Sequence, residues 1–361
     1  MNSEEKTKKF SNLFEEIIGF EELKEELTKT KKLIAYDGYE PSGKIHIAQG
    51  LMRAIYIKKL QEMGIEFKIL IADWLAFANN KMNGNMEKIQ ETGRYYIEVW
   101  KSCGIDTDKI KFYWTSEFVK DDSYWLLVMK IAKETTLQRI IRCSQVMGRS
   151  EKEILAASQI LYPCMQAADA FYIGANINQM GIDQRKVNIL TRQVAESLGF
   201  KKPIAAHHHM LTSLLPPSSN INYKDKIEQS IALKMSKSKP GSAIFMSDTR
   251  DEVSSKILKA YCPPKQVEAN PILEYFKYIV FPSFEKIVIS REDKHGGDLE
   301  YTNYQNLEND YINDNIFALD LKNNLSKYLN ILLDQSRDYF SKNKKAKKLQ
   351  DNVISYLNNK K

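Results

Sequence analysis

Short apolar runs separated by amphipathic stretches dominate the first two thirds of the chain. Residues 33–36, 67–73 (FKILIAD) and 109–114 (KIKFYW) are apolar runs of strand length. After the first of them, apolar residues recur at helical spacing from His46 until Gly64, which marks a helix end. Strands that alternate with helices are typical of βαβ units. The pattern therefore predicts an α/β fold with a parallel sheet and ligands at the carboxyl ends of its strands.

The hydrophobic pattern changes at four further places, and these divide the chain. Residues 1–32 are glutamate-rich and amphipathic, which predicts an N-terminal helical extension. Residues 115–170 are mostly helical in pattern and interrupt the alternation, as an inserted subdomain would. The polar residues 215–230 predict a loop, and from about Cys262 the pattern is mainly helical with no parallel strand. The expected units are residues 1–32, 33–262 and 263–361.

Positive charge is concentrated at one end of the 361 residues. The chain carries 53 Lys and Arg against 46 Asp and Glu, a formal charge of +7. Residues 321–361 hold ten Lys and Arg and three Asp, so 10 − 3 = +7 equals the whole excess. This distribution favours a polyanionic partner, although a solvated helical tail would have the same composition.

Hydropathy and the placement of cysteines indicate in which cellular compartment the protein is expected. No apolar run approaches the roughly 20 residues that span a bilayer, and the N-terminus lacks the apolar core of a signal peptide. The four cysteines lie far apart with no CxxC pair, which favours free thiols and no zinc. They are Cys103, Cys143, Cys164 and Cys262. We therefore expect a cytoplasmic protein that does not contact membranes.

Two loops have the composition of phosphate-binding segments. "EPSGKIHIAQG", residues 40–50, lies between a predicted strand and a predicted helix, where loop amides can hold phosphate. A capping or core role for His46 fits this position equally well. "LKMSKSKPG", residues 233–241, places Lys234 and Lys237 three apart in a flexible segment. A solvated surface turn has the same composition, so this loop alone decides nothing.

The stretch "LYPCMQAADAFYIG" aligns three polar side chains on one face of a predicted helix. Tyr162, Gln166 and Asp169 are spaced four and three apart, and Pro163 fits the first turn of that helix. Burying polar groups without partners costs roughly 1 to 3 kcal/mol each. Either an internal hydrogen-bond network or a ligand with both an amine and a hydroxyl would satisfy them.

Two polar segments follow this helix. "GIDQRK", residues 181–186, adds Gln184 and the cation Arg185 in a loop that begins another helix. The triplet His207, His208 and His209 resembles a metal cluster only superficially. Adjacent residues of a strand point to opposite faces, so three in a row do not converge on one ion.

Taken in chain order, these motifs resemble those of class I aminoacyl-tRNA synthetases. Residues 46–49 stand in the position of the HIGH motif, and residues 234–238 in that of the KMSKS motif. The polar helix face with "GIDQRK" resembles the tyrosyl-tRNA synthetases of the archaeal and eukaryotic type, from about residue 30 to about residue 340. The resemblance implies a Rossmann-like catalytic domain with a helical insertion, and a mainly α-helical C-terminal anticodon-binding domain. The implied reaction joins L-tyrosine and ATP as tyrosyl-adenylate, releases pyrophosphate, and transfers tyrosine to the 3′ end of tRNA(Tyr).

The resemblance also implies residue roles. Catalysis would use His46, Gln49, Lys234 and Lys237, and ATP would also contact Gly43, Met235, Ser236 and Ser238. Tyr36 and Asp169 would bind the tyrosine hydroxyl, and Tyr162, Gln166 and Gln184 its amine. The tRNA acceptor stem would contact Arg185, Arg139 and Arg142. The anticodon would contact His295 and Asp320.

Partners and departures follow from the same resemblance. Mg²⁺ is expected to bind together with ATP. The chain is expected to form a homodimer through the inserted subdomain. Gln49 stands where the second histidine of HIGH is usual, and Lys237 where close relatives often have serine. Three alternatives stay open: the related tryptophanyl enzyme, an RNA-binding protein on a retired synthetase scaffold, and a small nucleotidylyltransferase.

Overall fold

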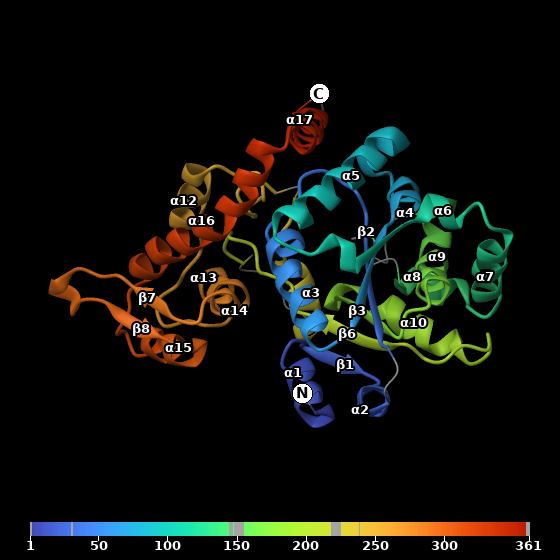
Figure 1. Cartoon of the computed structure of the whole chain (residues 1–361), viewed down its shortest axis with the longest axis horizontal. Helices are drawn as coiled ribbons and strands as arrows, with labels where there is room; N and C mark the ends of the chain where they lie inside the picture. Colours follow the sequence, from blue (N-terminus) through green and yellow to red (C-terminus); the bar gives the residue numbers. More distant parts are fainter. Residues whose placement is uncertain are drawn as a thin grey trace.

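A six-stranded sheet forms the centre of the molecule (Figure 1). The computed structural model describes residues 2–358 except 30–31, 144–146, 148–154, 218–224 and 238. The strands are β1 Glu16–Ile18, β2 Ile34–Tyr39, β3 Glu66–Ile71, β4 Ile110–Trp114, β5 Ile177–Gly181 and β6 Ile204–His208. They lie in the order β1-β6-β5-β2-β3-β4, and all neighbouring pairs are parallel except β1 with β6. The parallel α/β fold predicted from the sequence is confirmed.

The helices that precede the C-terminal region cover both faces of this sheet. They are α1 Ser3–Ser11, α2 Phe20–Thr28, α3 Arg53–Glu62, α4 Asp73–Ala78, α5 Met86–Ser102, α6 Thr115–Phe118, α7 Asp122–Lys133, α8 Leu137–Arg142, α9 Ala157–Ile173, α10 Arg185–Ala195, α11 Lys226–Leu233 and α12 Arg250–Lys259. Ala35 and Ile69 pack in one core with α3 and α5, whereas Tyr36 and Leu70 pack in a second core with α9 and α10. Because neighbouring strand residues point to opposite faces, the sheet separates these two cores. Burial on both faces explains the continuous apolar runs of the sequence.

The C-terminal region is mainly helical, as expected. Its elements are α13 Pro271–Tyr275, α14 Phe281–Ser283, β7 Ile287–Ile289, β8 Leu299–Tyr301, α15 Tyr304–Ile312, α16 Ala318–Lys342 and α17 Lys344–Asn358. β7 and β8 pair with each other in an antiparallel ribbon. In Figure 1 the orange β7, β8 and α15 lie on the opposite side of the sheet from α7 of the helical insert.

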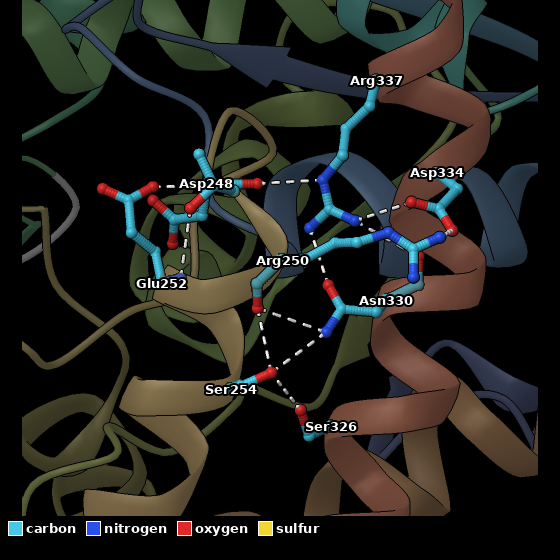
Figure 2. A network of polar contacts seen from close by, with 9 residues as sticks. Asp248, Arg250, Glu252, Ser254, Ser326, Asn330, Asp334 and Arg337 are labelled. Carbon is cyan, nitrogen blue, oxygen red and sulfur yellow. Dashed lines mark hydrogen bonds and ion pairs between the residues drawn. The ribbon is translucent and has the colours of Figure 1, made fainter.

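A polar network joins α12 to the long helix α16 (Figure 2). Arg337 donates to the carbonyl of Asp248 at 3.1 Å and to the carboxylate of Asp334 at 2.9 Å. Asn330 donates to the carbonyl of Arg250 at 3.4 Å, and the Arg250 guanidinium pairs with Asp334. These contacts fix α16 against the segment that leaves the α/β unit.

Three local predictions are wrong in detail. Residues 1–32 do not form a single helix, because β1 lies between α1 and α2 and pairs with β6. Residues 226–230 are not loop: Asp225 accepts a hydrogen bond from the Glu228 amide and begins α11. Pro163 lies inside α9 and not in its first turn, since that helix begins at Ala157.

Candidate active site

A cavity of about 300 Å³ opens beside the carboxyl ends of β2 and β5. These two strands are neighbours at the point where the chain turns from one half of the sheet to the other, which is where ligands bind in open α/β sheets. Its walls come from the ends of these strands, residues 40–49, α9, residues 208–211 and the start of the KMSKS segment. The sequence motifs therefore meet at one place.

The predicted face of α9 lines this cavity. Tyr162, Gln166 and Asp169 all contribute to its wall, with Tyr36 of β2 beside them. Asp169 is buried and accepts a hydrogen bond from the hydroxyl of Tyr124 at 2.8 Å. Burial raises the pKa of Asp169 to about 8, although the hydrogen bond from Tyr124 opposes that shift. This end of the cavity offers a phenol and a carboxyl group in an otherwise apolar setting.

A pair of glutamines forms the next part of the wall. Nε2 of Gln166 donates to Oε1 of Gln184 at 3.0 Å, which fixes the orientation of both amides. The buried Oε1 of Gln166 finds no hydrogen-bond partner within the described part of the chain. An unpartnered acceptor in a cavity is suited to a ligand that carries N–H groups, such as an amine.

Two further side chains that line the cavity carry unsatisfied atoms. Nδ1 of His46 and Oε1 of Gln49 are buried and have no partner among the described residues. Burial lowers the pKa of His46 well below its usual value, and the nearby Lys237 and Lys234 lower it further. His46 is therefore neutral at physiological pH. The preceding Gly43 has a φ of 123°, a backbone conformation that favours glycine.

The KMSKS segment reaches the cavity through its first residues. Nζ of Lys234 pairs with Asp183 at 2.7 Å, and this carboxylate raises the pKa of the lysine. Met235 is buried in the cavity wall. Lys237 points instead to the hydroxyl of Tyr96, at 2.7 Å, and to Oγ of Ser42, at 3.3 Å. The backbone of this segment is also held, because the carbonyl of Ser236 accepts from Oγ of Ser242 at 2.6 Å. Ser238 lies outside the described residues.

The arginines predicted to contact an acceptor stem gather around the junction of α8 and α10. Nη2 of Arg139 donates to the carbonyl of Lys186 at 3.5 Å, and Arg142 is exposed on the same helix. Nε of Arg185 pairs with Glu16 at 2.8 Å. The three cations are therefore outside the cavity, and one of them is engaged by the N-terminal segment.

The two anticodon candidates lie together in the C-terminal region. His295 is exposed and packs edge-on against Phe317, with ring centroids 5.7 Å apart. Phe317 is the N-cap of α16, and Asp320 lies in the first turn of that helix. Oδ2 of Asp320 is buried with no partner in the described chain. An exposed aromatic ring thus lies near a carboxylate that has an unpartnered, buried oxygen.

The histidine triplet does not gather at one point. His207 contacts Glu16 at 2.8 Å, His208 contacts Arg53 at 3.2 Å, and His209 contacts Glu274 at 3.1 Å. Among the described residues, three or more metal-ligating side chains are nowhere grouped as a candidate metal site. Nor does that part of the chain contain a helix long and apolar enough to cross a membrane.

The sequence interpretation missed two side chains of the site. Tyr124 lies on α7, 45 residues before its partner Asp169, and no local spacing connects them. Asp183 lies within "GIDQRK", directly before Gln184, so a carboxylate in a predicted ligand loop was an available signal. Its partner is Lys234, and the pair connects the two loops across the cavity.

Comparison with known proteins decides the family. Residues 28–334 match the family described as tRNA synthetases class I (W and Y). The chain is 46% identical over 360 residues to the cytoplasmic tyrosine–tRNA ligase 1 of Arabidopsis thaliana, covering 98% of this chain and 90% of that protein. It is 40% identical over 331 residues to the tyrosine–tRNA ligase of Saccharolobus solfataricus, covering 91% of this chain and 90% of that protein. The chain belongs to the tyrosine–tRNA ligase family.

Solved structures place the chain among tyrosyl-tRNA synthetases. The Pyrococcus horikoshii tyrosyl-tRNA synthetase complexed with L-tyrosine superposes with a TM-score of 0.90 at 35% identity, covering 97% of this chain and all of that one. The tryptophanyl-tRNA synthetase of Aeropyrum pernix superposes with a TM-score of 0.67 at 18% identity, which shows a shared fold alone. The resemblance to the tyrosyl family drawn from the sequence motifs is therefore confirmed.

Proposed function

We propose how this chain carries out the reaction of its family. As a tyrosine–tRNA ligase it joins L-tyrosine to tRNA at the expense of ATP. One observation carries the assignment of its site: the polar face of α9 and Lys234 line the same cavity at the switch point of the sheet. Tyrosine binds against α9, and the triphosphate extends toward Lys234. The carboxylate then attacks the α-phosphate, forming tyrosyl-adenylate and releasing pyrophosphate.

The amino acid is recognised at both ends. Tyr36 and Asp169 hold the phenolic hydroxyl, because they supply a donor and a carboxyl group in the buried part of the cavity. Phenylalanine leaves these groups without partners, which costs roughly 1 to 3 kcal/mol for each. Gln166, Gln184 and Tyr162 hold the α-amine, and the unpartnered Oε1 of Gln166 accepts one of its N–H groups.

ATP is held between two loops. Gly43, His46 and Gln49 contact the phosphates from one side, and neutral His46 donates a hydrogen bond without adding charge. Lys234 leaves Asp183 to neutralise the departing pyrophosphate, and Lys237 with Ser236 and Met235 orders the rest of the loop. Such positioning and charge stabilisation is the main contribution that proteins make to phosphoryl chemistry. Mg²⁺ enters with ATP as part of the substrate, bound chiefly by phosphate and water oxygens, and no zinc is used.

The tRNA binds across two units of the chain. We assign residues 33–262 to catalysis and residues 263–361 to the anticodon. Arg139, Arg142 and Arg185 contact the acceptor stem, while the ring of His295 stacks on an anticodon base and Asp320 accepts from its guanine. Residues 1–32 form an N-terminal extension that joins the catalytic sheet through β1.

A homodimer forms through the helical insert. Four large apolar side chains are exposed in its described part, with exposed fractions of 57% for Leu126, 60% for Met129, 55% for Leu137 and 39% for Leu161. Neighbouring exposed apolar residues are typical of a protein interface. The dimer is cytoplasmic.

The test is ATP–pyrophosphate exchange with each of the twenty amino acids, followed by charging of tRNA(Tyr). We expect exchange with tyrosine alone, and Lys234→Ala should lower its kcat strongly while tyrosine still binds. Exchange with tryptophan would overturn the assignment of Tyr36 and Asp169. A folded protein that exchanges with no amino acid would favour the RNA-binding alternative.

A further inference from the structure

The side chain of Glu274, on the short helix α13, lies at the border between the C-terminal region and the active site. Its Oε2 accepts from the amide of Thr212 at 2.8 Å, and its Oε1 accepts from the Thr212 hydroxyl at 2.7 Å. The hydroxyl of Tyr275, the next residue of α13, donates to the carbonyl of Thr212 at 3.0 Å. Every polar group of Thr212 is therefore held by α13.

Thr212 is in turn joined to the KMSKS segment by backbone contacts. It forms an antiparallel bridge with Lys234. On either side of that bridge, the Ser213 amide donates to the Leu233 carbonyl at 2.7 Å, and the Met235 amide donates to the Leu211 carbonyl at 2.8 Å. A displacement of Thr212 would consequently move the backbone that carries the Lys234 side chain.

A second contact strengthens the same junction. Nε2 of His209 contacts Oε2 of Glu274 at 3.1 Å, and its Nδ1 contacts Glu15 of the N-terminal segment. The imidazole stacks on Tyr278 with ring centroids 4.2 Å apart and an interplanar angle of 12°. His209 lines the active-site cavity on one side and an adjoining cavity, walled by Glu274 and Tyr278, on the other. Glu274 therefore anchors both ends of residues 209–212.

We propose that Glu274 is a positioning residue for the activation step. By holding Thr212 and His209 it fixes the strand-like segment 209–212, and through the bridge it sets where Lys234 meets the leaving pyrophosphate. A carboxylate is suited to this place because it accepts three hydrogen bonds at once, from an amide, a hydroxyl and an imidazole. The C-terminal region thereby contributes to chemistry on ATP as well as to tRNA binding. The inference rests on the role proposed above for Lys234.

The test compares Glu274→Gln with a matched control in steady-state ATP–pyrophosphate exchange. Glutamine keeps the shape but replaces one acceptor oxygen by an NH₂ group that faces donors. The control is Glu308→Gln, since Glu308 lines the same adjoining cavity from α15 and its carboxylate accepts a hydrogen bond from Gln305, at 3.0 Å, on its own helix. We expect kcat of Glu274→Gln to fall about tenfold, while the tyrosine Kd, measured by calorimetry, stays within about twofold. The control should match the unmodified protein in both.

A second variant keeps the proposal testable if Glu274→Gln folds poorly. Thr212→Val removes the hydroxyl that donates to Glu274 and keeps the side-chain shape and the backbone amide. It should also lower kcat. The kcat of the double variant should be little lower than that of Glu274→Gln alone, because the two changes remove the same interaction between Thr212 and Glu274.

The outcomes separate this inference from the proposed function. An unchanged kcat for Glu274→Gln, with a low kcat for Lys234→Ala, would overturn the inference alone. An unchanged kcat for Lys234→Ala would overturn the role of that lysine. If Glu274→Gln weakened tyrosine binding as much as it lowered kcat, the residue would be structural, and the proposal would also fail.

Discussion

The buried carboxyl of Asp169 should make the protein less stable as the pH rises, and Asp169→Asn should remove that effect. The pKa of Asp169 is raised from 3.8 to about 8, chiefly by burial. Between these two values the unfolded chain has lost the proton and the folded protein has kept it. Folding therefore takes up a proton, and the free energy of unfolding falls by about 1.4 kcal/mol for each pH unit in this window.

The expected size follows directly. From pH 5 to pH 7 this one group lowers the stability by about 3 kcal/mol, and asparagine, which does not titrate, does not. Relative to the unmodified protein, Asp169→Asn should thus gain about 3 kcal/mol over this range. The exposed Asp338, on α16, provides the matched control: the stability of Asp338→Asn relative to the unmodified protein should hardly change with pH.

The assay is urea unfolding without substrates at pH 5, 6 and 7, at one protein concentration, for all three proteins. Comparing differences between variants removes the contributions of other titrating groups, since these are common to all three. A difference between Asp169→Asn and the unmodified protein that stayed constant from pH 5 to pH 7 would refute the reasoning. It would mean that Asp169 is already ionised in the folded state at pH 5.

Three further results are expected. Arg53→Met leaves the buried Asp37 without its ion-pair partner, which lies at 3.1 Å. The free energy of unfolding, measured with urea, should fall by about 3 to 5 kcal/mol. A fall of less than about 1 kcal/mol would contradict this. Asp320→Asn should lower kcat/KM for tRNA about tenfold and leave exchange without tRNA unchanged; an equal fall in both would argue against an anticodon role. Burial opposes the charged form of His209, but Glu15 and Glu274 outweigh it and raise the pKa of His209 to about 9. His209→Gln should therefore remove about 3 kcal/mol of stability below pH 6.5, and this loss should vanish as the pH rises through 9. Urea unfolding at several pH values measures it. A difference that grew with pH would contradict that last expectation.

The sequence predicted the parts of the site that follow a local spacing. Tyr162, Gln166 and Asp169 share one face because helical periodicity places them there, and the structure confirms that this face lines the cavity. The alternation of strands and helices likewise predicted the parallel sheet. In each case the signal lies within one element, where the side chain and its neighbours are close in sequence.

The remaining features depend on partners that are distant in sequence. Tyr124 meets Asp169 only because α7 packs against α9, and nothing in the local pattern of α7 distinguishes this tyrosine from a core residue. Thr212 is an ordinary threonine until α13 supplies Glu274, which lies 62 residues later. The three residues of β1 are too few for a periodicity and become a strand only by pairing with β6.

That last strand has a consequence for the order in which the chain acquires its structure during synthesis. Glu16 pairs with His207, so 191 residues separate the two sides of the β1–β6 edge. At about 5 to 20 residues per second a ribosome needs roughly 10 to 40 s to make the segment between them. Throughout that interval β1 has no partner strand, and the charges of Glu15 and Glu16 at its start disfavour pairing of Ile17 and Ile18 with neighbouring chains. β1 thus leaves the ribosome before the other strands of its sheet and is among the last of them to find its place.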